Sequence, residues 1–259
     1  MLRVENMVCR AGGRLLVDDI SADFGAGMLH VIVGPNGSGK STFLSAFSGD
    51  RVPESGSVFY DGIAAEEMDK SDLARRRAVM SQLPELYFPL RVDDIVMMGR
   101  YPHFSYRPAA RDRQVCRMAM EQLEILEFAG RDYLTLSGGE RQRVQFARAL
   151  AQIGDRPAAG SRYLFLDEPV SSLDIRHQHQ LLRTARSLVS DTMVLIAILH
   201  DLNLALQYAD RIFFMKEGRL VAAGVPRDIV TRELVKEVFD VQAHLLDNPY
   251  GGARVIVYG

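Results

Sequence analysis

Short apolar or alternating runs fill the first third of the chain, and Gly or Asp residues bound each run. Alternation at a period of two is typical of half-buried strands, because successive side chains of a strand point to opposite faces. We therefore expect antiparallel strands at LRVEN (2–6), RLLVDDISADF (14–24) and GSVFYDG (56–62). MLHVIVG (28–34) is apolar almost throughout, which indicates a strand buried on both faces.

From about residue 71 to residue 153 the periodicity changes to three and four, which predicts helices. One expected apolar stripe consists of Val115, Met118, Ala119, Gln122, Leu123 and Leu126. GRYPHFSYRPAAR (99–111) predicts a connection inside this region. GDRPAAGSR (154–162) predicts a second connection, longer than the usual loop of about 4–6 residues.

The last third returns to strands. YLFLDEP (163–169) and TMVLIAILHD (192–201) are apolar runs with a helical stretch between them, which is the βαβ pattern of a parallel sheet. RIFFMKEGRLVAAG (211–224) predicts a hairpin that turns at Glu217 and Gly218. For residues 225–259 the pattern predicts one short helix and a strand at ARVIVYG (253–259).

Composition narrows the class of protein. A chain of 259 residues suits one large domain or a core with a lobe. Its formal charge of -2 and pI near 6.3 provide no overall basic field for nucleic acid. Cys9 and Cys116 lie far apart in sequence, which argues against a disulfide framework and fits a reducing compartment. With neither a signal-like start nor a run of roughly 18 apolar residues, we expect a soluble cytoplasmic protein that meets a membrane only through a partner.

A glycine-rich loop interrupts the apolar run VIVGPNGSGKSTFL (31–44). Residues 34–41 match G-x-x-x-x-G-K-[ST] between a predicted strand and a predicted helix, the context in which this pattern is specific. Glycines let backbone N–H groups converge on phosphate oxygens, and the following helix adds its positive end. Lys40 would then reach the β- and γ-phosphates, and Ser41 would bind Mg²⁺. The plainer alternative is a tight turn with a solvated lysine.

Two carboxylates follow the strand at 163–166. Asp167 would face a phosphate-bound Mg²⁺, and Glu168 would act as the general base that polarises the attacking water. The alternative is that Asp-Glu-Pro only caps the next helix.

LSGGERQ, which begins at Leu136, is a second glycine motif. Ser137 and Glu140 have the spacing of a capping box, and this interpretation accounts for them without any ligand. Two glycines inside a cap also expose backbone N–H groups in front of a helix dipole, which suits an anion.

The phosphate loop, LSGGERQ, LFLDEP, SSLD (171–174) and ILHD around His200 occur in this order along the chain. Together they resemble the nucleotide-binding subunit of ATP-binding cassette (ABC) transporters, over nearly the whole chain. The resemblance implies an α/β fold, a P-loop NTPase (RecA-like) core with an antiparallel β subdomain and an inserted helical subdomain. On that basis we expect the core at about 1–82 and 155–224, the helical subdomain at about 83–153 and an extension at 225–259.

The same resemblance implies the roles of individual residues. Nucleotide would bind Gly34, Pro35, Asn36, Gly37, Ser38, Gly39, Lys40, Ser41 and Thr42, and Ser137, Gly138 and Gly139 of a second copy would close on its γ-phosphate. Glu168, His200 and Gln82 would be catalytic, Mg²⁺ would bind Ser41, Gln82 and Asp167, and Asp174 would couple the two sites of the dimer. Each of three residues also has a plainer interpretation: Gln82 a surface amide, Asp174 a helix cap and His200 a strand-end histidine.

One position departs from the family. An aromatic residue that stacks on adenine usually precedes the early Gly-Gly turn, and this chain has Ala11 there. Base stacking on an aromatic is therefore missing at this position, so the base should be bound more weakly, or Arg10 or another side chain contacts it.

Within the family, the chain is most similar to the ATPases of haem importers. The segments that carry this similarity are RRRAVMSQLPELYFPLRVDDIVMMGRYPH, RDYLTLSGGERQRVQFARALAQ, GDRPAAGSR and LDIRHQHQLLR. Ferric-siderophore and cobalamin ATPases share much of the first segment, so those cargoes stay open. The resemblance implies a homodimer at the cytoplasmic face of a bacterial inner membrane, two permease subunits, an indirect contact with a substrate-binding protein, and no nucleic acid.

Two other classes of protein share some of these motifs. Non-transport cassettes of DNA repair or translation usually carry long coiled-coil inserts or tandem cassettes, and this chain shows neither pattern. A small-molecule kinase could also use a phosphate loop. Glu168, placed to activate water, and the LSGG motif both argue against a kinase.

Overall fold

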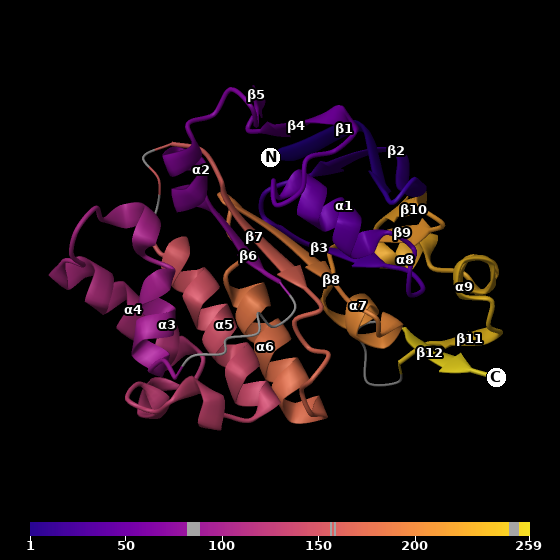
Figure 1. Cartoon of the computed structure of the whole chain (residues 1–259). Coiled ribbons are helices and arrows are strands. Elements are labelled where there is room, and N and C mark those ends of the chain that lie inside the picture. The colour runs from indigo at the N-terminus through magenta and orange to yellow at the C-terminus, as the bar shows by residue number, and fades with distance from the viewer. Residues whose placement is uncertain (82–88, 156, 158, 249–253) are drawn as a thin grey trace. The chain divides into compact units, whose positions relative to one another are not determined.

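The computed structural model describes residues 1–81, 89–155, 157, 159–248 and 254–259, which form two compact units (Figure 1). Unit 1 contains residues 1–67 and 189–259, and unit 2 contains residues 68–188. The division into core, helical subdomain and extension stays a prediction. Gln82 lies outside the described residues.

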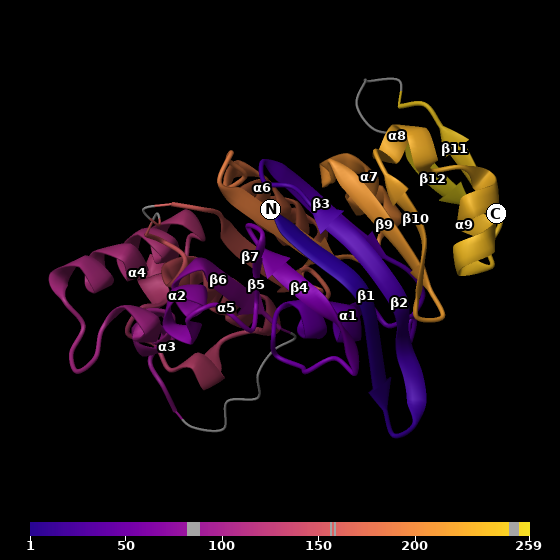
Figure 2. The ribbon, with the colours of Figure 1, turned by 90° about the horizontal axis from the view of Figure 1, so that it is seen from above.

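Unit 1 contains an antiparallel sheet with the strand order β2-β1-β4-β5. Its strands are β1 (Leu2–Ala11), β2 (Arg14–Phe24), β4 (Ser55–Tyr60) and β5 (Ile63–Ala64). The predicted antiparallel strands are thus confirmed, and Figure 2 shows β1, β2 and β4 side by side. β1 is longer than expected and reaches Ala11, because Gly12 and Gly13 form the turn to β2.

Parallel strands form the second sheet of unit 1. β3 (Met28–Val33) lies between β8 (Met193–Ile198) and β9 (Arg211–Lys216) and is parallel to both. All residues of β3 after Met28 are buried, as its apolar run predicted, and all residues of β8 are buried as well. β9 and β10 (Arg219–Gly224) form the predicted hairpin with its turn at Glu217 and Gly218. α1 (Lys40–Phe47) follows β3, and α7 (Leu202–Tyr208) follows β8.

The C-terminal end of unit 1 corrects the expectation of one helix and one strand. It contains two helices and a hairpin: α8 (Pro226–Ile229), α9 (Arg232–Phe239), β11 (Ala243–Leu246) and β12 (Val255–Tyr258) (Figure 2). Val230 has extended backbone and Thr231 caps α9 through the N–H of Leu234, so the helical stretch is divided. The amide of Asn203 on α7 exchanges two hydrogen bonds with the backbone of Ile256, at 3.1 and 2.7 Å.

Unit 2 is mostly helical, as its periodicity predicted. Its elements are α2 (Lys70–Arg76), β6 (Arg77–Met80), α3 (Val92–Met98), α4 (Ala110–Gln122), α5 (Gly138–Gln152), β7 (Arg162–Asp167) and α6 (Ile175–Ser187). Single 3-10 turns occupy Tyr101–His103, Leu126–Phe128 and Tyr133–Thr135. The helical expectation was wrong at Arg77–Met80, which forms β6 parallel to β7. This strand has only four residues with Ala78 and Met80 buried, too few for the period to be recognised.

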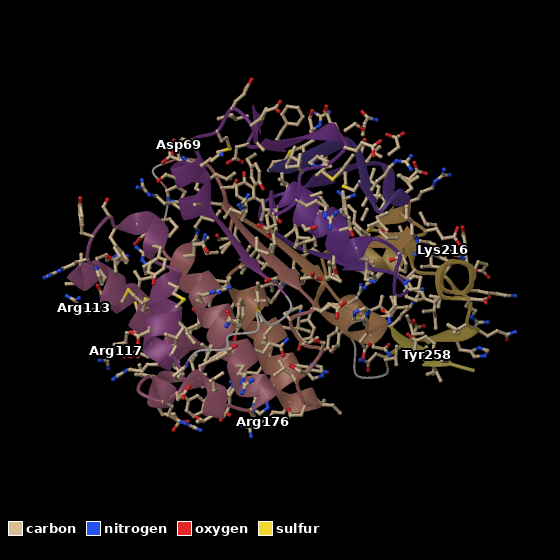
Figure 3. All side chains as sticks on the ribbon, in the orientation of Figure 1. Asp69, Arg113, Arg117, Arg176, Lys216 and Tyr258 are labelled. Atoms are coloured by element: carbon tan, nitrogen blue, oxygen red, sulfur yellow. The ribbon has the colours of Figure 1, made fainter. Side chains whose placement is uncertain are left out.

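The stripe predicted for α4 was also partly wrong. Met118 is 55% exposed and Gln122 is exposed, whereas Cys116 and Met120 are buried. The buried apolar face of α4 therefore consists of residues 115, 116, 119, 120 and 123, whose spacing is that of a regular helix. The opposite face of α4 carries Arg113 and Arg117, which project outward in Figure 3.

The predicted connection 99–111 is held by a buried guanidinium. Arg100, 1% exposed, donates to Asp112 at 3.0 Å, to the carbonyl of Ala151 at 2.8 Å, and to Asp155. His103 contacts the carbonyl of Gln152 at 2.7 Å. Burial of such charges is tolerated only with several partners, and here they join the ends of α3 and α5 to the start of α4.

Candidate nucleotide-binding site

Main-chain atoms of three neighbouring segments hold the glycine loop between β3 and α1. A Cβ on Gly34 would lie 2.1 Å from the carbonyl oxygen of Met215 on β9, and one on Gly39 would lie 2.2 Å from that of Leu16 on β2. Gly39 also has φ of +97°, which disfavours a side chain. The N–H of Gly218, at the β9–β10 turn, donates to the carbonyl of Ser38 at 3.0 Å. Glycine is thus required here by the packing as well as by the motif.

Lys40 is the first residue of α1 and is 5% exposed. Its ammonium group donates to the carbonyls of Gly34 at 2.8 Å and Pro35 at 2.9 Å, so the charge lies over the loop. Ser41 and Thr42 follow in the first turn, whose backbone N–H groups have no acceptor within the helix. A buried cation and the positive end of α1 therefore converge on one loop, as an anion site requires.

His200 belongs to the same region of unit 1. Ile32 and Ile198 are paired in the parallel register of β3 and β8, and the N–H of Leu199 donates to the carbonyl of Ile32 at 3.2 Å. The two strands therefore end level, and the loop that begins at Gly34 and the exposed His200 follow them at one edge of the sheet.

In unit 2, Asp167 is the last residue of β7 and Glu168 follows it in left-handed conformation, with φ of +52°. Non-glycine residues rarely adopt this conformation, and residues that do so are often found at functional sites. The carbonyl of Glu168 accepts hydrogen bonds from the side-chain amide of Gln142 at 3.2 Å and from the hydroxyl of Ser171 at 3.1 Å. These bonds fix the backbone at the residue expected to act as base.

The start of α5 forms the predicted capping box. The N–H of Ser137 donates to the Glu140 carboxylate at 2.7 Å, and the N–H of Glu140 donates to the Ser137 hydroxyl at 3.3 Å. The backbone hydrogen bond from Ser137 is the main reason that the pKa of Glu140 is lowered. A Cβ on Gly139 would lie 3.0 Å from Leu173, so the LSGG segment lies against the SSLD segment.

Asp174 is the N-cap of α6, so the plainer interpretation of this residue is also true. Its carboxylate accepts from the backbone N–H of His177 at 2.9 Å and contacts the His177 ring at 2.8 Å. These hydrogen bonds, the backbone one first, lower the pKa of Asp174. Its coupling role stays a prediction.

Two supporting residues were missed by the sequence analysis. Gln142 is 4% exposed and also accepts from the Ser172 hydroxyl at 2.7 Å. Gln178 on α6 donates to the carbonyls of Val170 at 3.3 Å and Leu173 at 3.0 Å. The sequence did not indicate their role, because a glutamine on a helix is expected at the surface unless its burial is known.

The expected Mg²⁺ site offers few protein ligands. Among the described residues, no group of three or more His, Cys, Asp or Glu side chains could hold a metal ion. The expected Mg²⁺ ligands are of another kind, since Ser41 offers a hydroxyl and Asp167 a single carboxylate. Both are hard oxygen donors, and Mg²⁺ bound to a nucleotide needs only one or two of them from the protein.

The loop geometry in unit 1, with its buried lysine and following helix, defines a P-loop nucleotide-binding protein. The chain belongs to the ABC transporter family, whose model matches residues 17–171. It is an ATP-hydrolysing cassette, and the predicted P-loop NTPase fold of this family is confirmed. Of the helices that the structure describes, none combines the length and the apolar character that a membrane span requires.

Relatives match over almost their full length. The "Hemin import ATP-binding protein HmuV" of Gloeobacter violaceus is 41% identical over 99% of this chain and 94% of that protein. The protein of the same name from Bordetella bronchiseptica is 43% identical over 99% of this chain and 98% of that protein. Among solved structures, an inward-facing metal-chelate type ABC transporter has a TM-score of 0.82 and 25% identity, covering 100% of this chain and 96% of its own.

Proposed function

We propose that this chain is the ATP-hydrolysing subunit of a bacterial importer that moves haem through a separate membrane permease. The assignment of haem as the cargo rests on the match, at 39–43% identity and over 91–99% of the chain, to proteins named for hemin import. The phosphate loop built around Lys40 supports the nucleotide part independently of any relative.

The proposed roles divide between the units. From unit 1, residues 34–42 bind the phosphates, Ser41 supplies a hydroxyl for Mg²⁺, and His200 contacts the γ-phosphate. From unit 2, Asp167 completes the Mg²⁺ ligands, and Glu168 takes the proton of the attacking water. Mg²⁺, when bound, neutralises charge on the β- and γ-oxygens. Gln82 is proposed as the link between this site and the permease.

The proposed assembly is based on the same family resemblance. We propose a homodimer in which Ser137, Gly138 and Gly139 of one copy meet the nucleotide of the other, with Asp174 between the two sites. The dimer would bind two permease subunits at the cytoplasmic face of the inner membrane, as a peripheral complex. A substrate-binding protein would act on it only through the permease.

The deciding experiment uses the subunit reconstituted with its own permease in vesicles. Haem-loaded binding protein should raise ATP hydrolysis and drive haem transport, and a Glu168→Gln variant should bind ATP yet turn over at least a hundredfold more slowly. Glu168→Asp is the matched control, since it keeps a carboxylate and should retain part of the activity.

A second cargo class is favoured by one observation, the structural similarity to a metal-chelate type transporter. If a ferric siderophore or cobalamin stimulates hydrolysis while haem does not, the ATPase role stands and the haem assignment is wrong. If Glu168→Gln hydrolyses ATP at the normal rate, the assignment of the base is wrong whatever the cargo.

A further inference from the structure

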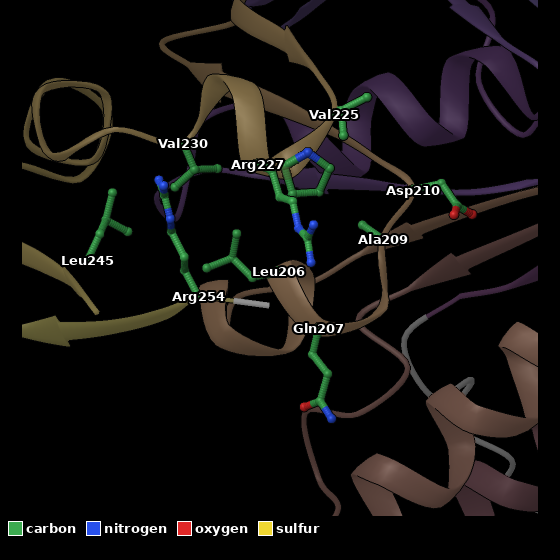
Figure 4. A pocket seen from close by; sticks show the side chains of 10 residues that line it. Leu206, Gln207, Ala209, Asp210, Val225, Arg227, Val230, Leu245 and Arg254 are labelled. Carbon is green, nitrogen blue, oxygen red and sulfur yellow. The ribbon is translucent and has the colours of Figure 1, made fainter. Parts of the chain in front are cut away.

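Unit 1 contains a cavity of about 290 Å³ that none of the proposed roles uses. It lies at the C-terminal end of the chain, between α7, α8 and the β11–β12 hairpin (Figure 4). Leu206, Val225, Val230 and Leu245 supply apolar lining, and Arg227 and Arg254 supply two guanidinium groups.

The walls of this cavity are fixed by the fold. Leu206 is 8% exposed and Val230 is 4% exposed, so these two side chains belong to the packed core, whereas Val225 is 48% exposed. The hairpin wall is attached to α7 by the two hydrogen bonds between the Asn203 amide and the backbone of Ile256. One wall of the cavity is therefore held in place by hydrogen bonds, and binding sites for small molecules are usually largely preformed.

The charges of the lining indicate what would bind there. Arg227 comes from α8 and Arg254 directly precedes β12, and Figure 4 shows both beside Leu206. The carboxylate of Asp210 also lines the cavity, but one of its oxygens accepts from the N–H of Leu29 at 2.7 Å. Arg254 contacts Asp247 at 3.2 Å, but the Asp247 side chain is 91% exposed, and an ion pair so exposed to water is weak.

We propose that this cavity binds a small amphiphilic anion, with its carboxylate or phosphate on Arg227 and Arg254 and its apolar body against Leu206, Val230 and Leu245. Arginine suits this headgroup because its planar fork donates two parallel hydrogen bonds to a carboxylate or a phosphate. A cation would meet two guanidinium charges against the single carboxylate of Asp210, and a fully polar anion would leave the apolar wall without a partner.

The cavity is connected to the nucleotide region through one short helix. α7 has seven residues, and its cap, Asp201, accepts from the N–H groups of Asn203 at 2.7 Å and Leu204 at 3.2 Å. His200 directly precedes this cap, while Leu206 near the other end lines the cavity. A ligand that packs against α7 opposes any shift of His200 during turnover, so it lowers the rate of hydrolysis. This effect on the rate rests on the proposed ATPase role, whereas binding does not.

The test uses the full chain with its phosphate loop filled by ADP. The probes are 2-naphthoate and 2-naphthyl phosphate as anions, 2-naphthol as the neutral analogue and 2-naphthylmethylamine as the cation. The chain has no tryptophan, so naphthalene fluorescence can be followed directly. We expect at least one anion to bind at least tenfold more tightly than the amine, and the better headgroup distinguishes a carboxylate ligand from a phosphate ligand.

Three variants and a control locate the site. Arg227→Gln and Arg254→Gln should each weaken the preferred anion about tenfold while leaving 2-naphthol unchanged. Val225→Phe should weaken both probes, and because Val225 is 48% exposed the larger ring can enter without disturbing the core. Arg232→Gln, an exposed arginine on α9 outside the cavity, should change neither.

Equal binding of the amine and the anions, or anion binding that none of the three variants weakens, would overturn the site. For the coupling, a saturating anion should lower basal hydrolysis at least twofold in the unmodified chain and not in Arg254→Gln. Binding without any change in hydrolysis would overturn the coupling through α7. Failure of haem to stimulate transport leaves both results unaffected, so the two proposals fail separately.

Discussion

In unit 1 the loop 34–39 is held by main-chain atoms of β2 and β9, whereas in unit 2 the segment 168–173 is held by the side-chain amides of Gln142 and Gln178. The first arrangement admits only glycine where two backbones meet, since a Cβ on Gly34 or Gly39 would lie within 2.2 Å of a carbonyl oxygen. The second depends on the buried amide of Gln142 and the half-buried amide of Gln178. The two units therefore place their functional residues by different physical means.

Replacing Gly39 should have the largest effect on stability. Gly39→Ala adds a methyl group 2.2 Å from the carbonyl of Leu16 at a φ of +97°, so overpacking and backbone strain act together. We expect a loss of about 2–4 kcal/mol in the free energy of unfolding, measured by urea denaturation, and a loss of ATP binding.

Gly37→Ala is the matched control in the same loop. Gly37 has φ of +78° but nothing within 4 Å of an added Cβ, so only strain applies. Its cost should be about 1–2 kcal/mol. Equal costs at Gly37 and Gly39 would show that close contact with β2 does not hold the loop.

This contrast explains what the sequence could and could not predict. A close backbone approach leaves a glycine at a fixed spacing, so the phosphate loop was recognised together with the strand and helix around it. The roles of Gln142 and Gln178 depend on which turns of α5 and α6 are buried against residues 168–173, and that is a tertiary property. The strand Arg77–Met80 was missed for a similar reason, because its identity comes from pairing with β7 and not from its own four residues.

Replacing Gln142 should have the next largest effect, which is expected mainly in the kcat of ATP hydrolysis. Gln142→Ala removes the donor to the carbonyl of Glu168 and the acceptor for the Ser172 hydroxyl, which should cost only about 0.5–1.5 kcal/mol, because Ser171 still donates to that carbonyl and Ser172 is exposed to water. Because Gln142 positions Glu168 and is not expected to touch nucleotide, kcat should fall about tenfold while KM for ATP stays within twofold.

Gln142→Glu separates the two bonds, since it keeps the acceptor for Ser172 and loses the donor to Glu168. It should lower kcat as much as Gln142→Ala if the bond to Glu168 matters. Gln114→Ala, at an exposed position on α4, should change nothing. A change in KM alone would indicate that Gln142 acts on nucleotide binding instead.

Gly138 should show a small effect on stability with the opposite sign. An added Cβ meets nothing closer than 3.9 Å, and this position is the first residue of α5. Alanine favours a helix over glycine, so Gly138→Ala should raise the free energy of unfolding by up to about 1 kcal/mol.

Hydrolysis should nevertheless fall at least tenfold in Gly138→Ala, if the glycine is there for close approach to the nucleotide of a second copy. The measurement pairs urea denaturation with steady-state hydrolysis. Gly139→Ala is the comparison, because its Cβ would lie 3.0 Å from Leu173 within the same chain and should cost some stability. Normal ATP turnover by the Gly138→Ala variant would show that Gly138 is not needed for close approach to the nucleotide of a second copy.

The smallest expected effect is on the pH dependence of stability, which should differ between the histidines of the two units. Unit 1 buries His30 on β3, which is 0% exposed and bonds to the carbonyl of Gly25 at 2.8 Å, while unit 2 contains His103, whose side chain is 11% exposed. Burial is the main cause that lowers the pKa of both, and the backbone bond of each opposes it in part.

A lowered pKa means that the unfolded chain binds a proton in a range where the folded chain does not. Stability is therefore full above the unfolded pKa of about 6.5 and is lost as pH falls from there towards the folded pKa. His30→Gln keeps a hydrogen-bond donor for Gly25 and cannot titrate, so it should flatten the decline in unfolding free energy between about pH 6.5 and pH 5. His103→Gln should flatten it less, because the His103 side chain is partly exposed and loses less hydration on folding. If the two variants respond equally, complete burial in unit 1 gives no greater sensitivity to acid than the partly solvated site in unit 2.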